Sequence, residues 1–370
     1  AVEREDHERL ASLAVARDGH VRDVHAGLSE QGADAADHAG HVVVAQEDRE
    51  QQPPVGREHA RDRAVDDGLG KIPGCHARRE VRIRVGSGQL DVDPGIECEL
   101  RPGGPSLNIG QLLLAGRVDM IMSNSFEAFT FVREGAPFFT IAAIFQKDPQ
   151  VLIAHPGSGF DSFEKLKGRI LLIGAGGRVT YWPFLRKKYG LKDEQLRPYN
   201  FQVAPFLANP NTVQQGFLSS EPYSIAQALG REPEVMLIAD AGFSAYQTTI
   251  AISRKLAQEK KDLIQRFVDA TLEGWAQYLR GGPATDAANA MIRRDNPDQT
   301  DDRIAYAVKV LNRHGIVMSG DALTGGIGAM SDARWKSFYE SMTDVDVLPR
   351  GLDVRQAYSL DFVNKGIGRN

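Results

Sequence analysis

The placement of aromatic residues divides this 370-residue chain into two unlike parts. All 28 aromatic residues lie at or beyond Phe126, whereas seven of the nine histidines lie within the first 76 residues. Because aromatic side chains supply much of the energy of a packed core, a core built from residues 1–93 alone would be unusual. Residues 1–93 also hold 13 Lys and Arg against 19 Asp and Glu, so the remainder of the chain is close to neutral.

Three interpretations of residues 1–93 compete. The segment is a disordered acidic extension, a small helical appendage, or the product of another reading frame of a GC-rich gene, joined to the true frame near Asp93-Pro94. We favour the last hypothesis, because the abundant Ala, Arg, Gly, Asp and His are the residues that such frames tend to produce.

From Pro94 onward, short apolar runs alternate with helical patterns. Strands are expected at 96–100, 118–122, 138–145, 151–154, 169–173, 235–239 and 248–252. Helices are expected at 108–115, 126–134, a segment ending at Gly190, 303–313 and 332–342, and apolar residues from Leu263 to Leu279 recur at helical spacing. This alternation predicts an α/β fold with parallel sheets covered on both faces and a ligand crevice at the strand ends.

Several functional classes are disfavoured by the composition. No apolar run reaches 18 residues, and no basic, apolar and small-residue succession marks a secretion signal. Cys75 and Cys98 lie in no metal-binding or redox spacing, and the near-neutral body lacks the basic excess of a nucleic-acid binder. His155 and His314, the only histidines beyond residue 93, stand outside any catalytic motif. We therefore expect no enzyme activity, no metal and no cofactor.

A glycine-rich turn follows the expected strand at 169–173. Its flexible backbone leads into a helix, where unpaired N–H groups and the helix dipole suit an anionic group or a ring acceptor. A tight turn backed by core aromatic residues is about equally consistent with this pattern. The candidate ligand-binding residues of this turn are Gly176, Gly177, Arg178, Thr180, Tyr181 and Trp182.

Other candidates lie where expected strands or helices end. Small polar side chains at such ends can fix a ligand by hydrogen bonds, although each also suits a helix cap or a polar strand exit. A carboxylate at the start of a helix can accept hydrogen bonds from an amino-heterocycle, or simply belong to an acidic first turn. The candidates of this kind are Ser123, Asn124, Gln146, Glu221, Tyr223 and Asp240.

Several short motifs, taken in order, carry a family resemblance. They are Gly-Ile-Glu-Cys-Glu-Leu-Arg-Pro-Gly-Gly-Pro (95–105), Ala-Gly-Arg-Val-Asp (115–119), Phe145-Gln146, Leu166-Lys-Gly-Arg, the turn at 174–177 and Glu221-Pro-Tyr. In this order and spacing the chain resembles the thiamine-pyrimidine-precursor and alkanesulfonate type of ABC solute-binding proteins. The resemblance covers about 94–363, whereas residues 1–93 show neither the first strand nor the signal of such relatives.

The resemblance implies a periplasmic-binding-protein-like fold of the second type, in which two α/β lobes hold a ligand in the cleft between them. Lobe 1 would comprise residues 94–154 and 245–370, and lobe 2 residues 155–244, with crossovers near His155 and near 243–248. The implied partners are a small-molecule ligand, an ABC permease and its ATPase subunit, and the implied location is the periplasm.

Three alternatives share this fold. One is a synthase that builds a pyrimidine precursor, which needs a lysine, a sacrificial histidine and a cysteine-rich motif; no cysteine follows Cys98. The second is a binding protein for a small anion such as an alkanesulfonate, and the third is a sensor module. The aromatic side chains of Tyr181, Trp182 and Tyr223 favour a flat heteroaromatic ligand such as an aminopyrimidine.

The frame hypothesis makes a direct prediction. Sequencing the gene across the codons of Asp93 and Pro94 should reveal a frame change near this junction. One uninterrupted frame that relatives share on both sides would contradict it.

Overall fold

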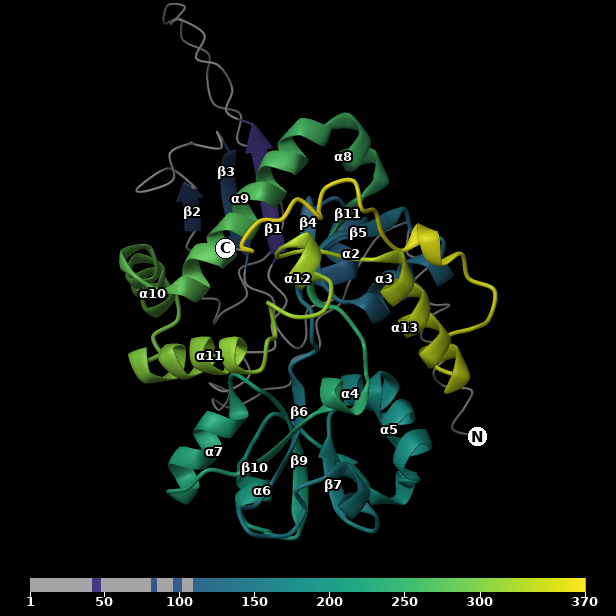
Figure 1. Cartoon of the computed structure of the whole chain (residues 1–370), viewed down its shortest axis with the longest axis vertical. Coiled ribbons are helices and arrows are strands. Elements are labelled where there is room, and N and C mark those ends of the chain that lie inside the picture. Colours follow the sequence, from purple (N-terminus) through teal and green to yellow (C-terminus); the bar gives the residue numbers. More distant parts are fainter. Residues whose placement is uncertain (1–41, 48–80, 85–95, 102–108, 370) are drawn as a thin grey trace, which may run out of the picture. The chain divides into compact units, whose positions relative to one another are not determined.

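The computed structural model describes residues 42–47, 81–84, 96–101 and 109–369. These residues belong to one compact unit, 34–370. Within it, the strands form two sheets (Figure 1). The six-stranded sheet contains β4, β5 and β11, and the five-stranded sheet contains β6, β7, β9 and β10. Helices accompany both sheets, which confirms the predicted α/β class with two lobes. No helix in the described ranges is long and apolar enough to span a membrane.

The six-stranded sheet has the order β2-β3-β1-β4-β11-β5. Each neighbouring pair is antiparallel. Two of its strands, β1 and β2, lie within residues 1–93, where the sequence predicted no strand. The strands are β1 (Val42–Glu47), β2 (Val81–Arg84), β3 (Ile96–Arg101), β4 (Met120–Ser123), β5 (Phe138–Phe145) and β11 (Gln247–Ser253).

The five-stranded sheet has the order β10-β6-β9-β7-β8. Here β7 runs parallel to β8 and β9, whereas β6 is antiparallel to β9 and β10. The expectation of parallel sheets is therefore wrong except for β7, β8 and β9. The strands are β6 (Gln150–Ala154), β7 (Ile170–Ile173), β8 (Leu196–Pro198), β9 (Thr212–Phe217) and β10 (Glu234–Leu237).

The helices follow the apolar patterns of the sequence. The predicted amphipathic helix is α9, which buries Leu263, Phe267 and Leu272. Gly190 ends α5 with a φ of 65°, a left-handed conformation that glycine adopts without a Cβ clash. The other helices are α2 (Ile109–Leu114), α3 (Ser125–Arg133), α4 (Ala175–Val179), α6 (Ala204–Leu207), α7 (Glu221–Leu229), α8 (Arg254–Glu259), α10 (Pro283–Asp295), α11 (Asp301–Arg313), α12 (Ala322–Gly325) and α13 (Asp332–Asp344), beside α5 (Tyr181–Tyr189) and α9 (Lys261–Arg280).

The chain changes sheet twice. The first crossing, residues 146–149, joins β5 to β6, and the second, residues 238–246, joins β10 to β11 and includes the short 3₁₀ helix η4 (Ile238–Ala241). The crossing was expected near His155, but it lies several residues earlier. Residues 150–154 already pair with β9 and β10 and so belong to the five-stranded sheet. His155 itself is buried, with Nε2 at 2.8 Å from the Phe206 carbonyl oxygen.

One side chain of α13 joins the two crossings. The guanidinium of Arg334 donates from Nε to the Ser244 carbonyl oxygen at 3.0 Å and from Nη2 to the Gln146 carbonyl oxygen. Its guanidinium carbon lies 4.3 Å from the centre of the Tyr246 ring, and the side chain is only 17% exposed. Arginine suits this position because its planar fork of donors stays charged and can serve two acceptors while stacking on a ring.

We predict that Arg334→Met destabilises the fold by about 2–4 kcal/mol, because the carbonyl groups of the buried Gln146 and the half-buried Ser244 lose a charged donor. Urea unfolding of parent and variant measures this difference. Lys336→Met on the same helix is the control: the Lys336 side chain is 71% exposed, so its loss should change stability by less than about 0.5 kcal/mol. Equal unfolding midpoints for parent and Arg334→Met would contradict the assigned role.

Candidate functional site

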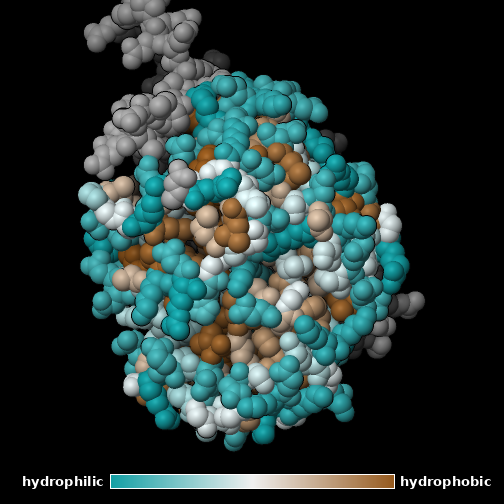
Figure 2. All heavy atoms as spheres, in the orientation of Figure 1, coloured by the Kyte–Doolittle hydropathy of each residue, from teal (hydrophilic) through white to brown (hydrophobic). Residues whose placement is uncertain are grey.

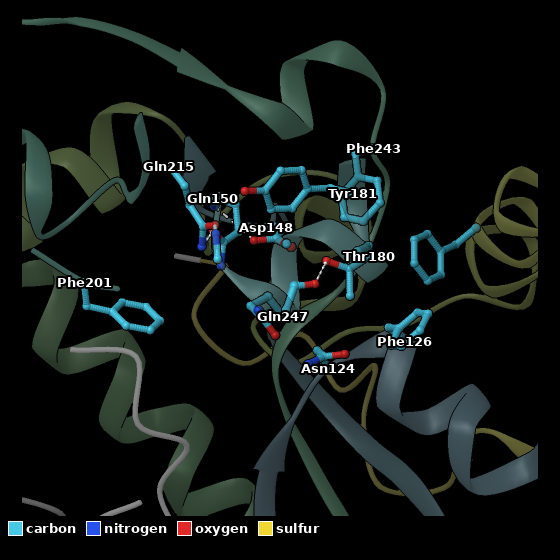
Figure 3. Close-up of a pocket in the computed structure, with 15 residues that line it drawn as sticks. Asn124, Phe126, Asp148, Gln150, Thr180, Tyr181, Phe201, Gln215, Phe243 and Gln247 are labelled. Carbon is cyan, nitrogen blue, oxygen red and sulfur yellow. Dashed lines mark hydrogen bonds between the residues drawn. The ribbon is translucent and has the colours of Figure 1, made fainter. Parts of the chain in front are cut away.

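A pocket of about 220 Å³ lies where the two crossings meet the starts of α3 and α4. Its lining draws on both sheets, since Asn124 and Phe126 follow β4, while residues 174–181 follow β7 and form α4, which contains Gly176 and Gly177 (Figure 3). Most of the face seen in Figure 2 is hydrophilic, and hydrophobic residues appear mainly toward its middle. The pocket thus collects segments that are far apart in the sequence.

The glycine-rich turn forms one wall through close backbone packing. The Gly174 N–H donates to Gln215 Oε1 at 2.9 Å, so this N–H is already satisfied within the protein. A Cβ on Gly177 would lie 2.6 Å from the Tyr181 hydroxyl oxygen, whereas a Cβ on Gly176 would meet nothing within 4 Å. Any side chain at position 177 would clash with the Tyr181 hydroxyl, so this position requires glycine.

Two buried polar groups lie in the pocket wall. Asp148, on the first crossing, is 7% exposed and accepts a hydrogen bond from the Gln150 N–H at 3.0 Å. Burial raises its pKa to about 6, although the hydrogen bond from Gln150 acts in the opposite direction. The Tyr181 hydroxyl has no hydrogen-bond partner among the described residues. Burial, with smaller contributions from Asp148, Glu221 and Tyr199, raises the pKa of Tyr181 well above its ordinary value.

Aromatic rings supply the apolar part of the lining. Phe243, on the second crossing, meets the Tyr181 ring edge-on at 6.5 Å and the Phe338 ring at 5.5 Å. In Figure 3, Phe201 and Phe126 lie on opposite sides of the pocket. Phe201 has a φ of 60°, a left-handed conformation that costs a non-glycine residue about 1–2 kcal/mol. The pocket therefore combines flat apolar walls with a small number of polar groups, as small-molecule sites do.

Comparison with known proteins places the chain in a family. The model of the family described as NMT1/THI5 like matches residues 92–284, which is more than half of the chain. The chain belongs to the NMT1/THI5-like family. The riboflavin-binding protein RibY of Chloroflexus aurantiacus is 26% identical to this family member over 243 residues, which cover 63% of this chain and 67% of RibY.

Solved structures with a similar arrangement include binding proteins and an enzyme. The periplasmic aliphatic sulphonate binding protein SsuA from Escherichia coli is 15% identical, with a TM-score of 0.44 over 67% of this chain and 77% of SsuA. The desulfurization enzyme DszB is 14% identical, with a TM-score of 0.44 over 66% of this chain and 83% of DszB. With the family match, the two sheets and the pocket between them agree with the expected periplasmic-binding-protein-like fold.

Five of the residues that the sequence predicted for ligand binding line the pocket of this NMT1/THI5-like protein. They are Asn124, Gly176, Gly177, Thr180 and Tyr181. Asn124 also caps α3, because its Oδ1 accepts a hydrogen bond from the Glu127 N–H at 3.0 Å. The Thr180 hydroxyl donates to the Gly176 carbonyl oxygen at 2.8 Å. The two interpretations of Asn124, helix cap and pocket residue, thus hold together.

Three predicted residues at strand ends lie outside the pocket lining. The Ser123 hydroxyl donates to Glu127 Oε2 at 2.9 Å. The buried Gln146 side chain donates to two backbone carbonyl groups, at 3.0 and 2.8 Å. Asp240 is paired with Lys147 at 2.9 Å. In this structure each of these side chains is occupied by the protein itself.

Three predicted residues around the glycine-rich turn and α7 also lie outside the lining. The Trp182 indole is 2% exposed, and its N–H donates to Asp193 Oδ1 at 2.7 Å. The Arg178 Nε donates to a β7 carbonyl oxygen at 2.9 Å. The Tyr223 ring lies 5.3 Å from that of Tyr306 on α11. Their contact with a ligand therefore stays a prediction without support from the pocket geometry.

Glu221, the last of the predicted residues, lies in a buried network behind the pocket wall. Its Oε1 accepts a hydrogen bond from the Tyr199 hydroxyl at 3.1 Å, and its Oε2 accepts one from the Phe217 N–H at 2.8 Å. Gln214 Nε2 donates in turn to the Tyr199 hydroxyl at 3.3 Å. These bonds join the start of α7 to β9, and the charge of Glu221 is one of the smaller influences that raise the pKa of Tyr181.

Four polar residues of the pocket lining were not among the residues predicted from the sequence. These are Asp148, Gln150, Gln215 and Gln247. The polar residues that follow β5 did indicate a site, and Asp148 lies two positions after Gln146. The predicted residue, however, was Gln146, whose side chain bonds backbone carbonyl groups inside the protein. Gln215 gave no such signal, since it lies inside β9, which the sequence did not predict.

The raised pKa of Asp148 predicts a stability that depends on pH. Because the folded pKa of about 6 lies above the ordinary value of 3.8, ionisation of Asp148 opposes folding. The cost is full above about pH 6 and vanishes as the pH falls toward 3.8. Asp148→Asn should therefore stabilise the protein by as much as about 3 kcal/mol at pH 8 and by little at pH 4.

Urea unfolding at pH 8, 6 and 4 measures this trend. Asp161→Asn is the control, because Asp161 is an exposed carboxylate that pairs with Lys165 away from the pocket. A stability difference between parent and Asp148→Asn that stays constant over this range would contradict the buried, ionisable state of Asp148.

Proposed function

We propose that this protein is the solute-binding component of an ABC importer and that its pocket takes a small, flat heteroaromatic compound of the aminopyrimidine type. The observation that supports this most is the pocket at the two crossings, with aromatic walls and a buried polar end. Family membership and the similarity to a riboflavin-binding protein agree with such a role. The proposed partners are a permease and its ATPase subunit, and the proposed location is the periplasm.

The size of the pocket favours a ligand with one ring. Its volume of about 220 Å³ lies below the range of about 300–1,000 Å³ that is usual for small-molecule sites. A substituted pyrimidine suits such a space better than the three fused rings of a flavin. The Phe and Tyr rings of the wall offer flat faces and edges for stacking.

The composition of the lining favours binding over catalysis. Among the described residues that line the pocket there is no lysine, histidine or cysteine. A synthase of the same fold would need a lysine and a histidine beside its substrate, so the enzyme alternative gains no support from this site.

The two crossings suggest how binding is signalled. A ligand that contacts Asn124 on one side and Tyr181 on the other bridges residues from both lobes. Such a ligand stabilises the arrangement in which both lobes contact it, and a permease can recognise that arrangement. Arg334 would hold the crossings together while residues on either side adjust.

A thermal-shift screen tests the proposal with 4-amino-2-methylpyrimidine, riboflavin and methanesulfonate as probes. The aminopyrimidine should raise the melting temperature in proportion to its occupancy, because it binds only the native state. Phe126→Ala, which removes a pocket ring, should reduce the shift. Tyr278→Ala, which removes a half-buried ring from α9 outside the pocket, should leave it unchanged. No shift with the aminopyrimidine would contradict the proposed ligand class.

A further inference from the structure

Two polar side chains of the pocket have hydrogen-bonding capacity that the described residues do not use. The Tyr181 side chain is 1% exposed, yet its hydroxyl makes no hydrogen bond among the described residues. Asp148 uses Oδ1 to accept from the Gln150 N–H, and Oδ2 accepts no hydrogen bond from the described part of the chain. Since buried donors and acceptors are almost always satisfied, the unmet Tyr181 hydroxyl indicates a place for a ligand, and the Asp148 carboxylate lines the same pocket.

Within the described part of the chain, no basic side chain pairs with the Asp148 carboxylate. The neighbouring Lys147 donates a hydrogen bond to Asp240. Arg334 donates its hydrogen bonds to the carbonyl groups of the crossings. The influences on the Asp148 carboxyl are burial and the Gln150 N–H, so its charge is not offset by a basic side chain. Tyr181 is the other titratable residue in the described lining, and Glu221 and Tyr199 lie beyond it. The polar end of the pocket is therefore acidic.

Gly177 and Gln215 fix the position of the Tyr181 hydroxyl. A Cβ atom on Gly177 would lie 2.6 Å from the oxygen of this hydroxyl and 2.9 Å from Gln215 Oε1, so both groups pack directly against the Gly177 backbone. Gln215 is in turn held by the Gly174 N–H at 2.9 Å and donates to Gln150 Oε1 at 3.3 Å. The hydroxyl is thus held in place by packing, while its hydrogen-bonding capacity remains unused, which is the arrangement of a preorganised binding group.

We propose that Asp148 and Tyr181 are the specificity determinants of the pocket: the carboxylate accepts an N–H of an amino-substituted nitrogen heterocycle, the Tyr181 hydroxyl bonds an adjacent ring nitrogen, and the carboxylate excludes small anions. This inference rests on the proposed function and adds its selectivity. A sulfonate would bring a second negative charge into the buried acidic end of the pocket, and like charges repel strongly at such sites. The pocket thus favours a donor ligand over an anion.

The test compares matched ligands on matched variants by isothermal titration. The probes are 4-amino-2-methylpyrimidine, 4-methoxy-2-methylpyrimidine, which replaces the N–H donor by an acceptor, and methanesulfonate. The variants are Asp148→Asn, Tyr181→Phe and the control Asp161→Asn. In Asp148→Asn the Gln150 N–H can keep its bond to the side-chain oxygen, so the amide NH₂ would replace the acceptor that the ligand needs.

The parent should bind the amino compound more tightly than the methoxy compound. Asp148→Asn should weaken the amino compound by about 10- to 100-fold, reduce or invert its preference over the methoxy compound, and strengthen methanesulfonate. Tyr181→Phe should weaken the amino compound by about 3- to 10-fold. Asp161→Asn should match the parent throughout. The preference between two ligands within one variant does not depend on how stable that variant is.

The outcomes separate the two proposals. If the parent binds the aminopyrimidine but Asp148→Asn keeps its affinity and its preference, the specificity proposal fails and the proposed function stands. If the parent binds methanesulfonate more tightly than the aminopyrimidine, the exclusion of anions is overturned. If the parent binds no probe, the ligand class of the proposed function fails and the specificity proposal fails with it.

Discussion

The hydrogen bonds of the Arg334 guanidinium to the Gln146 and Ser244 carbonyl groups join the two chain crossings. Backbone that passes between two sheets lies outside either ladder, so its carbonyl groups need another donor if they are buried. A permanently charged, planar side chain meets two such acceptors at once and also stacks on the Tyr246 ring. Because Asp148 and Phe243 lie on these crossings, the position of the pocket walls depends on this junction.

The pocket itself is costly for the folded state. An ionised carboxyl at Asp148, a hydroxyl without a partner at Tyr181 and a left-handed backbone at Phe201 each oppose stability. The aromatic contacts around Phe243 and the buried network of Tyr199 and Glu221 surround these groups and hold them in place. Unfavourable groups that a well-packed shell maintains are the expected signature of a site kept for binding rather than for stability.

Much of the element order could be predicted from local patterns. Apolar, β-branched runs indicated the strands now seen as β4, β5, β7 and β11, and helical spacing of apolar residues indicated α9. The strand β9 escaped prediction because Gln214 and Gln215 interrupt its apolar run, although both are buried. Tyr199 accepts a hydrogen bond from Gln214 Nε2, and the Gly174 N–H donates to Gln215 Oε1; both partners come from other segments of the chain, which no local pattern reveals.

The sequence by itself determined the α/β class, the glycine-rich stretch that contains Gly177, the small polar residues before α3 and the resemblance that the family match bears out. Those features depend on backbone preferences and residue spacing, which are local. Only the tertiary structure decided that the first crossing falls at 146–149, that Asp148 rather than Gln146 faces the pocket, and that Trp182 bonds Asp193. The direction of a side chain and the pKa of a carboxyl depend on what packs around them, and those neighbours come from segments far apart in the chain.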